Sequence, residues 1–295
     1  MDVIARVAMG QIGTKQTRSD YIDNIRQIFT RDIRRSPLFC LSYLFPPLQL
    51  VFRRLLFLLS RLFGLPFEAI FKRIIDTVES RKKERVSRQL STVEVVAQCF
   101  VFLIAGFDTT SNSLAYVTFE LAKRRDIQQK LQQEIEDVCG NGPITFDHIP
   151  KLTFLDCVVK ESLRLYPLAA FASSRQAMRD TKLGDVEVEK GTLVLADTLT
   201  LHKTLWGPDA EEFRPERWQH NEEGARHPMA WIPFGAGPRV CIGMRLAMIE
   251  EKLMLANLLR RHYFVRTADS EPTLKLVGAS TISPVAVTIT LADRD

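Results

Sequence analysis

The sequence predicts a mainly α-helical protein of the α+β class, in which helices come first and small sheets follow. Three observations support this fold class. A long, proline-free apolar stretch is followed by two amphipathic segments, and short alternating segments appear from residue 183 onward. The chain has 295 residues, of which 46% are hydrophobic and 25% are charged, so it can bury a sizeable core. We expect a single domain over residues 1–295.

The first well-defined element is a helix expected over residues 91–125. Ser91 is followed three residues later by Glu94, a capping-box pattern in which each residue satisfies a backbone N–H of the other. The stretch is apolar on nearly all sides until Lys123. A helix of this kind is expected to run buried through the middle of a domain.

The remaining elements follow in order. We expect a polar, amphipathic helix over residues 126–139 and another over 155–165. The alternation in residues 183–198 predicts a hairpin that turns at Lys190–Gly191. A strong helix is expected from Cys241 to about Arg261, followed by strand-like segments to the end of the chain.

Charge and cysteine content exclude several functions. The net charge of +5 comes from scattered Lys and Arg, without the basic stripe of a nucleic-acid-binding protein. The five cysteines include no CxxC pair, which argues for a reducing compartment and against a disulfide framework or a structural zinc site.

The N-terminal part of the chain contains no predicted signal peptide or spanning helix. Residues 1–10 are interrupted by Asp2 and Arg6. The apolar segment Leu38–Phe67 contains Pro46–Pro47 and several arginines, so we expect it either to lie at a membrane surface or to pack on the core.

The segment FGAGPRVCIG holds the chain's clearest chemical signal. Cys241 precedes a helix whose positive end favours the thiolate form of a cysteine. Gly235 and Gly237 let the backbone pass close to a flat group, and Gly243 keeps bulk away from the start of the helix. Arg239 adds a cation. These groups suit a thiolate that serves as the axial ligand of a heme iron.

This segment, from Phe234 to Gly243, resembles the heme-ligand loop of the cytochrome P450 superfamily, Phe-Gly-x-Gly-x-Arg-x-Cys-x-Gly. All six fixed positions match, which chance would produce at roughly 1 in 10⁸ starting points. The chain is similar to the animal microsomal branch. The resemblance implies a cytochrome P450 fold, with a large helical domain and small β-sheets, and heme b (iron protoporphyrin IX) bound through Cys241.

Further motifs follow the same resemblance. Glu161 and Arg164 are three residues apart on one helix face and can form an ion pair. The resemblance implies that Arg217, in FRPERW, joins them in a buried structural network near the heme. It also implies that Arg239 and Arg175 contact the heme propionates. For His202 and Trp206 we expect only a structural role.

The long helix contains the sequence AGFDTT. Gly106 leaves room for a ligand or O₂ beside the helix. Asp108 and Thr109 are polar residues in mid-helix, where neither favours helix formation. The resemblance implies that they relay protons to dioxygen; for Thr110 we expect an ordinary bond to a helix carbonyl.

The resemblance implies a heme-thiolate monooxygenase that inserts one oxygen atom of O₂ into a lipophilic substrate, with electrons from NADPH through a reductase. It also implies the cytoplasmic face of the endoplasmic reticulum membrane, with a peripheral or cytoplasmic location as the alternative. A basic face around Lys252, Arg260 and Arg261 is expected either to meet an acidic reductase or to be simply solvated.

Two other hypotheses stay open: a heme-thiolate isomerase of lipid peroxides that needs no reductase, and a truncated, non-catalytic form. The second follows because the sequence matches the family only from partway through its helical domain. We find no counterpart of the N-terminal anchor, the first strands, or the helix whose Trp and Arg contact the propionates.

Overall fold

The computed structural model describes residues 91–170, 174–219, 226–278 and 281–294, together with Val51, Leu55, Leu58, Lys72 and residues 74–76. The chain divides into two compact units, Met1–Asp108 and Thr109–Asp295. Apart from the first half of the long helix, the elements described below belong to the second unit.

Helix α6 spans Thr92–Ala122 and begins at the predicted capping box. The Ser91 N–H donates to a carboxylate oxygen of Glu94 over 2.7 Å, and the Glu94 N–H donates to Ser91 Oγ over 3.3 Å. The helix ends three residues earlier than expected. The N–H groups of Lys123 and Arg124 donate to carbonyls three residues back, which closes the last turn before the next helix starts.

The expectation that α6 is buried along its whole length is wrong. Val93 and Val101 are 77% and 56% exposed, whereas Val117 and Leu121 are fully buried. One described core cluster packs on the second half of the helix, at Tyr116, Val117 and Leu121, although Leu103 in the first half is also fully buried. Among the described residues, α6 is the helix that by length and composition could cross a membrane, a test that core helices of soluble proteins also pass.

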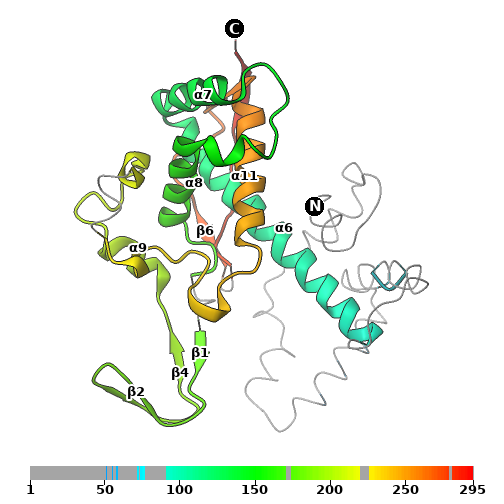
Figure 1. The fold of residues 1–295 in the computed structure, drawn as a ribbon, viewed down its shortest axis with the longest axis vertical. Helices are drawn as coiled ribbons and strands as arrows, with labels where there is room; N and C mark the ends of the chain where they lie inside the picture. Colours follow the sequence, from blue (N-terminus) through cyan, green and yellow to red (C-terminus); the bar gives the residue numbers. More distant parts are fainter. Residues whose placement is uncertain are drawn as a thin grey trace. The chain divides into compact units, whose positions relative to one another are not determined.

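Three helices form the core with the second half of α6. Helix α7 spans Arg125–Cys139, α8 spans Thr153–Leu165 and α11 spans Met244–Leu259, and Figure 1 shows α8 and α11 side by side. The first two confirm the predicted helices, while α11 starts three residues after Cys241. Their shared core includes Leu131, Ile135, Leu155, Val158, Val159, Leu255 and Leu259. Shorter helices are η3 (Ile149–Lys151), α9 (Thr198–Thr204), η4 (Pro215–Trp218), η5 (Pro228–Ala230) and η6 (Gly237–Arg239).

The described strands form four antiparallel pairs. These are β1 (Ser174–Gln176) with β4 (Leu193–Leu195), β2 (Thr181–Leu183) with β3 (Val186–Val188), β5 (His262–Val265) with β8 (Thr290–Asp293), and β6 (Leu276–Val277) with β7 (Ser283–Pro284). The predicted hairpin with its turn at Lys190–Gly191 is therefore wrong. The tight turn lies at Gly184, whose φ of 58° suits a two-residue hairpin loop, and Leu183 pairs with Val186.

A buried glutamine joins the helices to the C-terminal strands. Gln128, on α7, is 1% exposed, and its Nε2 donates to the carbonyls of Leu121 and Phe264 over 2.7 and 2.9 Å. Its Oε1 accepts from the Phe264 N–H over 2.9 Å. One side chain thus satisfies three buried backbone groups, which fixes β5 against α7 and the end of α6.

Candidate functional site

A buried carboxylate, that of Glu161, lies at the centre of the best-connected polar cluster among the described residues. Arg164 donates to it from Nε and Nη2 over 2.9 and 3.0 Å, and Arg217 donates from Nε over 2.9 Å. The Trp218 indole N–H and the Arg214 backbone N–H complete the set, each over 2.9 Å. Glu161, Arg164 and Arg217 are at most 1% exposed, so this network is isolated from water.

The two arginines use their remaining donors on the surrounding loops. Arg164 bonds to the carbonyls of His202, Ala210 and Glu212, over distances of 3.1, 2.6 and 2.9 Å. Arg217 bonds to the carbonyl and carboxylate of Asp209. The network therefore ties α8 to α9, to η4 and to the segment 209–214. Its buried charges are paired and hydrogen-bonded, which is the condition under which burial is tolerated.

His202 links this network to the segment that precedes the cysteine loop. Its Nδ1 lies 3.1 Å from the carbonyl oxygen of Arg164, and its Nε2 accepts a hydrogen bond from the Ile232 N–H over 2.9 Å. A ring that accepts at Nε2 must be neutral and must donate from Nδ1. The side chain is fully buried, and this desolvation lowers the pKa of His202 to about 4.

An aromatic series runs from the network to the start of the loop. The ring centroids of Trp206 and Trp218 are 4.8 Å apart, those of Trp218 and Trp231 5.4 Å, and those of Trp231 and Phe234 6.4 Å. The Trp206 N–H donates to the carbonyl of Ala230 over 2.9 Å. His202 and Trp206 are thus buried in structural contacts, in keeping with the role expected for them.

The loop from Phe234 to Cys241 closes on itself. Gly235 and Gly237 have φ values of 73° and 72°, a region that glycine enters without strain. The Cys241 N–H donates to the Phe234 carbonyl over 2.9 Å, and the Val240 N–H donates to the Gly237 carbonyl over 3.0 Å. These bonds hold the cysteine backbone opposite the first residue of the loop.

The thiol of Cys241 is exposed, and apolar side chains flank it. Val240 and Ile242 are 44% and 86% exposed. Gly243 caps α11, and a β-carbon built on it would lie 3.8 Å from the Cys241 Sγ, at ordinary van der Waals contact. An accessible sulfur ligand between exposed apolar groups, with exposed Arg239 nearby in η6, fits a flat, apolar, metal-bearing group that carries acidic substituents.

The other predicted site residues lie outside the cysteine loop, on α6 and β1. Gly106, Asp108 and Thr109 fall within one turn of α6, with Asp108 only 8% exposed and Thr109 half-buried. Arg175 is an exposed residue of β1, and its Nη1 donates to the carbonyl of Ser174 over 2.8 Å. The contacts of the described residues do not join Arg175 to the cysteine loop.

Sequence reasoning missed the environment of two α11 residues. Glu251 is 1% exposed, and burial raises its pKa to about 8, although Ser113 of α6 acts in the opposite direction. Lys252, expected on an open basic face, is 9% exposed and forms an ion pair with Asp156 of α8. Helical periodicity identifies neither, because α11 contains apolar residues on most of its faces.

Comparisons with known proteins point to one family. The family model described as Cytochrome P450 matches residues 1–284. The putative cytochrome P450 CYP13A10 of Caenorhabditis elegans is 40% identical over the whole chain, and CYP13A1 and cyp-13B1 of the same organism are 39% and 38% identical. The chain spans 65%, 65% and 64% of the lengths of these three relatives. The helix-rich fold with small antiparallel sheets agrees with the fold expected of that family.

The first prediction concerns the buried carboxylate. Replacing Glu161 by Gln keeps its shape but removes the counter-charge of buried Arg164 and leaves buried Arg217 with the Asp209 carboxylate alone. We expect the free energy of unfolding in urea to fall by roughly 3–5 kcal/mol. The control is Glu216→Gln, which breaks the more exposed pair with Lys130 and should cost no more than about 1 kcal/mol. Equal losses in the two variants would contradict a buried, interdependent network.

The second prediction concerns acid stability. The unfolded chain protonates His202 near its ordinary pKa of 6.5, whereas the folded chain does so only near 4. Protons therefore favour the unfolded state between these values, and stability falls as the pH decreases through this window, by up to about 1.4 kcal/mol per pH unit.

Urea unfolding at pH 7, 6 and 5 measures this effect. In His202→Asn the free energy of unfolding should be lower at pH 7 and should depend less on pH than in the native protein. His227→Asn, at an exposed site, serves as the control. An unchanged pH slope in the His202 variant would show that this imidazole is not the group that titrates.

Proposed function

The chain belongs to the cytochrome P450 family, and on this premise we propose that it is a heme-thiolate monooxygenase acting on lipophilic substrates. The observation that carries the proposal is the exposed thiol of Cys241, held by a self-closed glycine loop between apolar Val240 and Ile242. The reaction would insert one oxygen atom of O₂ into the substrate and release the other as water.

Cys241 would hold heme b through its Sγ, and Gly235 and Gly237 would let the porphyrin approach the loop backbone. Arg239 and Arg175 are the cations proposed for the propionates. When bound, this cofactor supplies the redox-active iron at which dioxygen is activated, with the thiolate as its electron-donating ligand. The protein would hold the thiolate in position, because hydrogen bonds and ring contacts connect the cysteine loop to the buried Glu161 network.

Asp108 and Thr109 would deliver the protons that the reaction consumes. A hydroxyl both donates and accepts, so Thr109 can pass a proton that the Asp108 carboxyl supplies. The low exposure of Asp108 keeps bulk water away from this step. Gly106, three residues before Thr109 on α6, leaves the helix surface without a side chain where substrate or dioxygen would lie.

Electrons would come from NADPH through a separate reductase, as the family generally requires a redox partner. Lys252 does not serve the proposed contact, because it pairs with Asp156. Arg261 is exposed and remains a candidate, whereas Arg260 donates to the Gly142 carbonyl. We propose an endoplasmic reticulum membrane location; the apolar segment 38–67 lies outside the described residues, apart from exposed Val51, Leu55 and Leu58.

The test of the proposal is the reduced, carbon monoxide difference spectrum of the heme-supplemented chain. We expect the red-shifted Soret band of a thiolate ligand, and its loss in Cys241→Ser. Cys99→Ser, at a described cysteine of α6 outside the loop, should keep the band. A band typical of imidazole-ligated or free heme in the native chain would overturn the proposal and favour the non-catalytic form.

The proton assignment has its own test. In Thr109→Ala we expect the product formed per NADPH consumed to fall severalfold while NADPH consumption continues. The reason is that protons would no longer be delivered to dioxygen when oxygen transfer needs them. Thr109→Ser, which keeps the hydroxyl, and Thr110→Ala should remain coupled. Full coupling in Thr109→Ala would remove the assignment, and turnover of a lipid peroxide without reductase would instead support the isomerase.

A further inference from the structure

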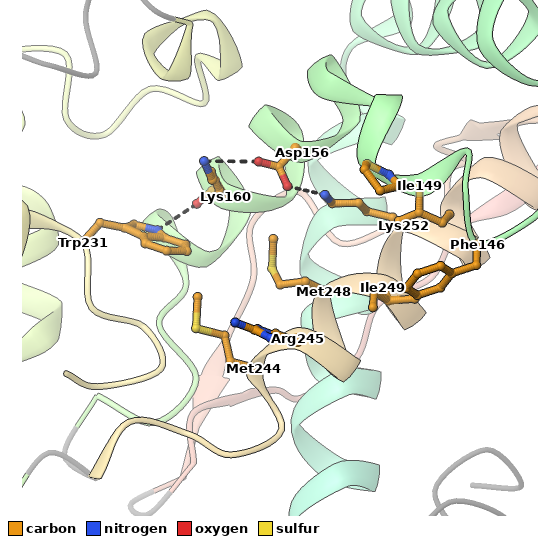
Figure 2. A pocket seen from close by; sticks show the side chains of 11 residues that line it. Phe146, Ile149, Asp156, Lys160, Trp231, Met244, Arg245, Met248, Ile249 and Lys252 are labelled. Atoms are coloured by element: carbon orange, nitrogen blue, oxygen red, sulfur yellow. Dashed lines mark hydrogen bonds and ion pairs between the residues drawn. The ribbon is translucent and has the colours of Figure 1, made fainter. Parts of the chain in front are cut away.

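A pocket of about 360 Å³ lies between α11, α8 and residues 146–150, and it includes no residue of the cysteine loop. Figure 2 shows its lining from close by. The apolar side chains that line it include Phe146, Ile149, Trp231, Met244, Met248 and Ile249. Its volume falls within the range of small-molecule sites, which are about 300–1,000 Å³.

One stripe of α11 supplies much of this lining. Met244, Met248 and Lys252 are spaced by four residues, and Arg245 and Ile249 follow beside them, so these side chains share a helix face. Toward the C-terminal end of the helix the same stripe enters the core: Leu255 lies seven residues after Met248 and Leu259 seven after Lys252, and both are fully buried. The pocket therefore lies over the N-terminal part of this face, where Met248 and Ile249 are only partly buried against the core.

The charged residues among those that line the pocket carry an excess of positive charge. The carboxylate of Asp156 pairs with Lys160 over 3.2 Å and also with Lys252. Burial alone would raise the pKa of Asp156, but its bonds and charge interactions with the two lysines lower it, so the group stays ionised. Arg245 adds a third cation, and no ion pair of this side chain is found among the described residues. Three cations thus face one carboxylate.

The aromatic wall is fixed in place. The Trp231 indole N–H donates to the Lys160 carbonyl over 3.2 Å, as Figure 2 shows, so the polar atom of the ring is already bonded. The ring also contacts Trp218 and Phe234, and the part of it that lines the pocket can meet an apolar ligand. Met244 and Met248 have unbranched side chains that adapt to ligands of different shape.

We propose that this pocket binds a small amphiphilic anion, of which a medium-chain carboxylate is the simplest example. The apolar part of the ligand would lie against Trp231, Met244 and Met248. Its charged head would bond to Arg245 and Lys160 and offset the excess positive charge. This ligand site goes beyond the proposed oxidation and is independent of the heme.

Calorimetric titration of the full chain with decanoate, below its micellar concentration, tests the proposal. We expect saturable binding of decanoate. The affinity for the neutral isostere decanol should be at least about tenfold lower, because decanol leaves the cations without a counter-charge. Arg245→Gln should weaken decanoate binding by a similar factor. Arg261→Gln removes the same charge outside the pocket and should leave binding unchanged. Equal affinities for decanoate and decanol, or no effect of Arg245→Gln, would overturn the proposal.

A second variant tests whether decanoate binds in this pocket. Met248→Trp is designed to fill the pocket, and it should abolish decanoate binding while the folded-state circular dichroism and the thiolate spectrum of Cys241 persist. Decanoate binding that survives in this folded variant would place the ligand elsewhere, including in the substrate site, and overturn the proposal. Absence of the thiolate band of Cys241 in the native chain would count against the proposed oxidation, but not against this ligand site.

The source of the anion is tested with vesicles. We expect free decanoate to bind without any membrane, and vesicles of neutral lipid with added phosphatidylserine to bind the native chain and Arg245→Gln equally. Two outcomes would overturn the proposal: binding that is seen only with such vesicles, or decanoate binding only above the micellar concentration. Either would mean that Arg245 contacts a lipid surface and not a single free anion.

Discussion

The carboxylate of Glu161 is the constraint on which the described structure depends most. It accepts five hydrogen bonds, from Arg164, Arg217, Trp218 and the backbone of Arg214, at a site with no exposure to solvent. A buried ion network of this kind contributes little net free energy when complete, but it is costly to break. Its effect is to fix the geometry of α8, η4 and the loops around them.

That geometry is passed on to the cysteine loop by two routes. One is the aromatic series from Trp218 through Trp231 to Phe234, whose carbonyl accepts from the Cys241 N–H. The other is His202, which bonds both to the end of α8 and to the Ile232 N–H. The thiol can therefore be exposed and still be held in position, which a ligand atom for a metal requires.

The sequence was most informative where short-range patterns carry the structure. The capping box at Ser91, the helices α7 and α8, and the resemblance at Cys241 all depend on residues a few positions apart. The predicted hairpin failed because both Gly184 and Gly191 adopt positive φ, and only long-range pairing shows that β4 belongs with β1. The same limit applies to Lys252, whose partner Asp156 is on another helix, and to Glu251, which only the folded chain buries. The end of α6 differs for a local reason, since tight backbone bonds at Lys123 and Arg124 stop the helix early.

Amide hydrogen exchange of the loop in Trp218→Phe tests most directly whether the Glu161 network holds the cysteine in place. This variant removes the indole N–H that bonds to Glu161 but keeps an aromatic ring next to Trp231. We expect the amides of Ile232 and Cys241 to exchange faster than in the native protein, while the amides of α7, which serve as the internal reference, stay unchanged. Unchanged exchange at Ile232 and Cys241 would mean that the loop keeps its position without the network, and the proposed link between them would be wrong.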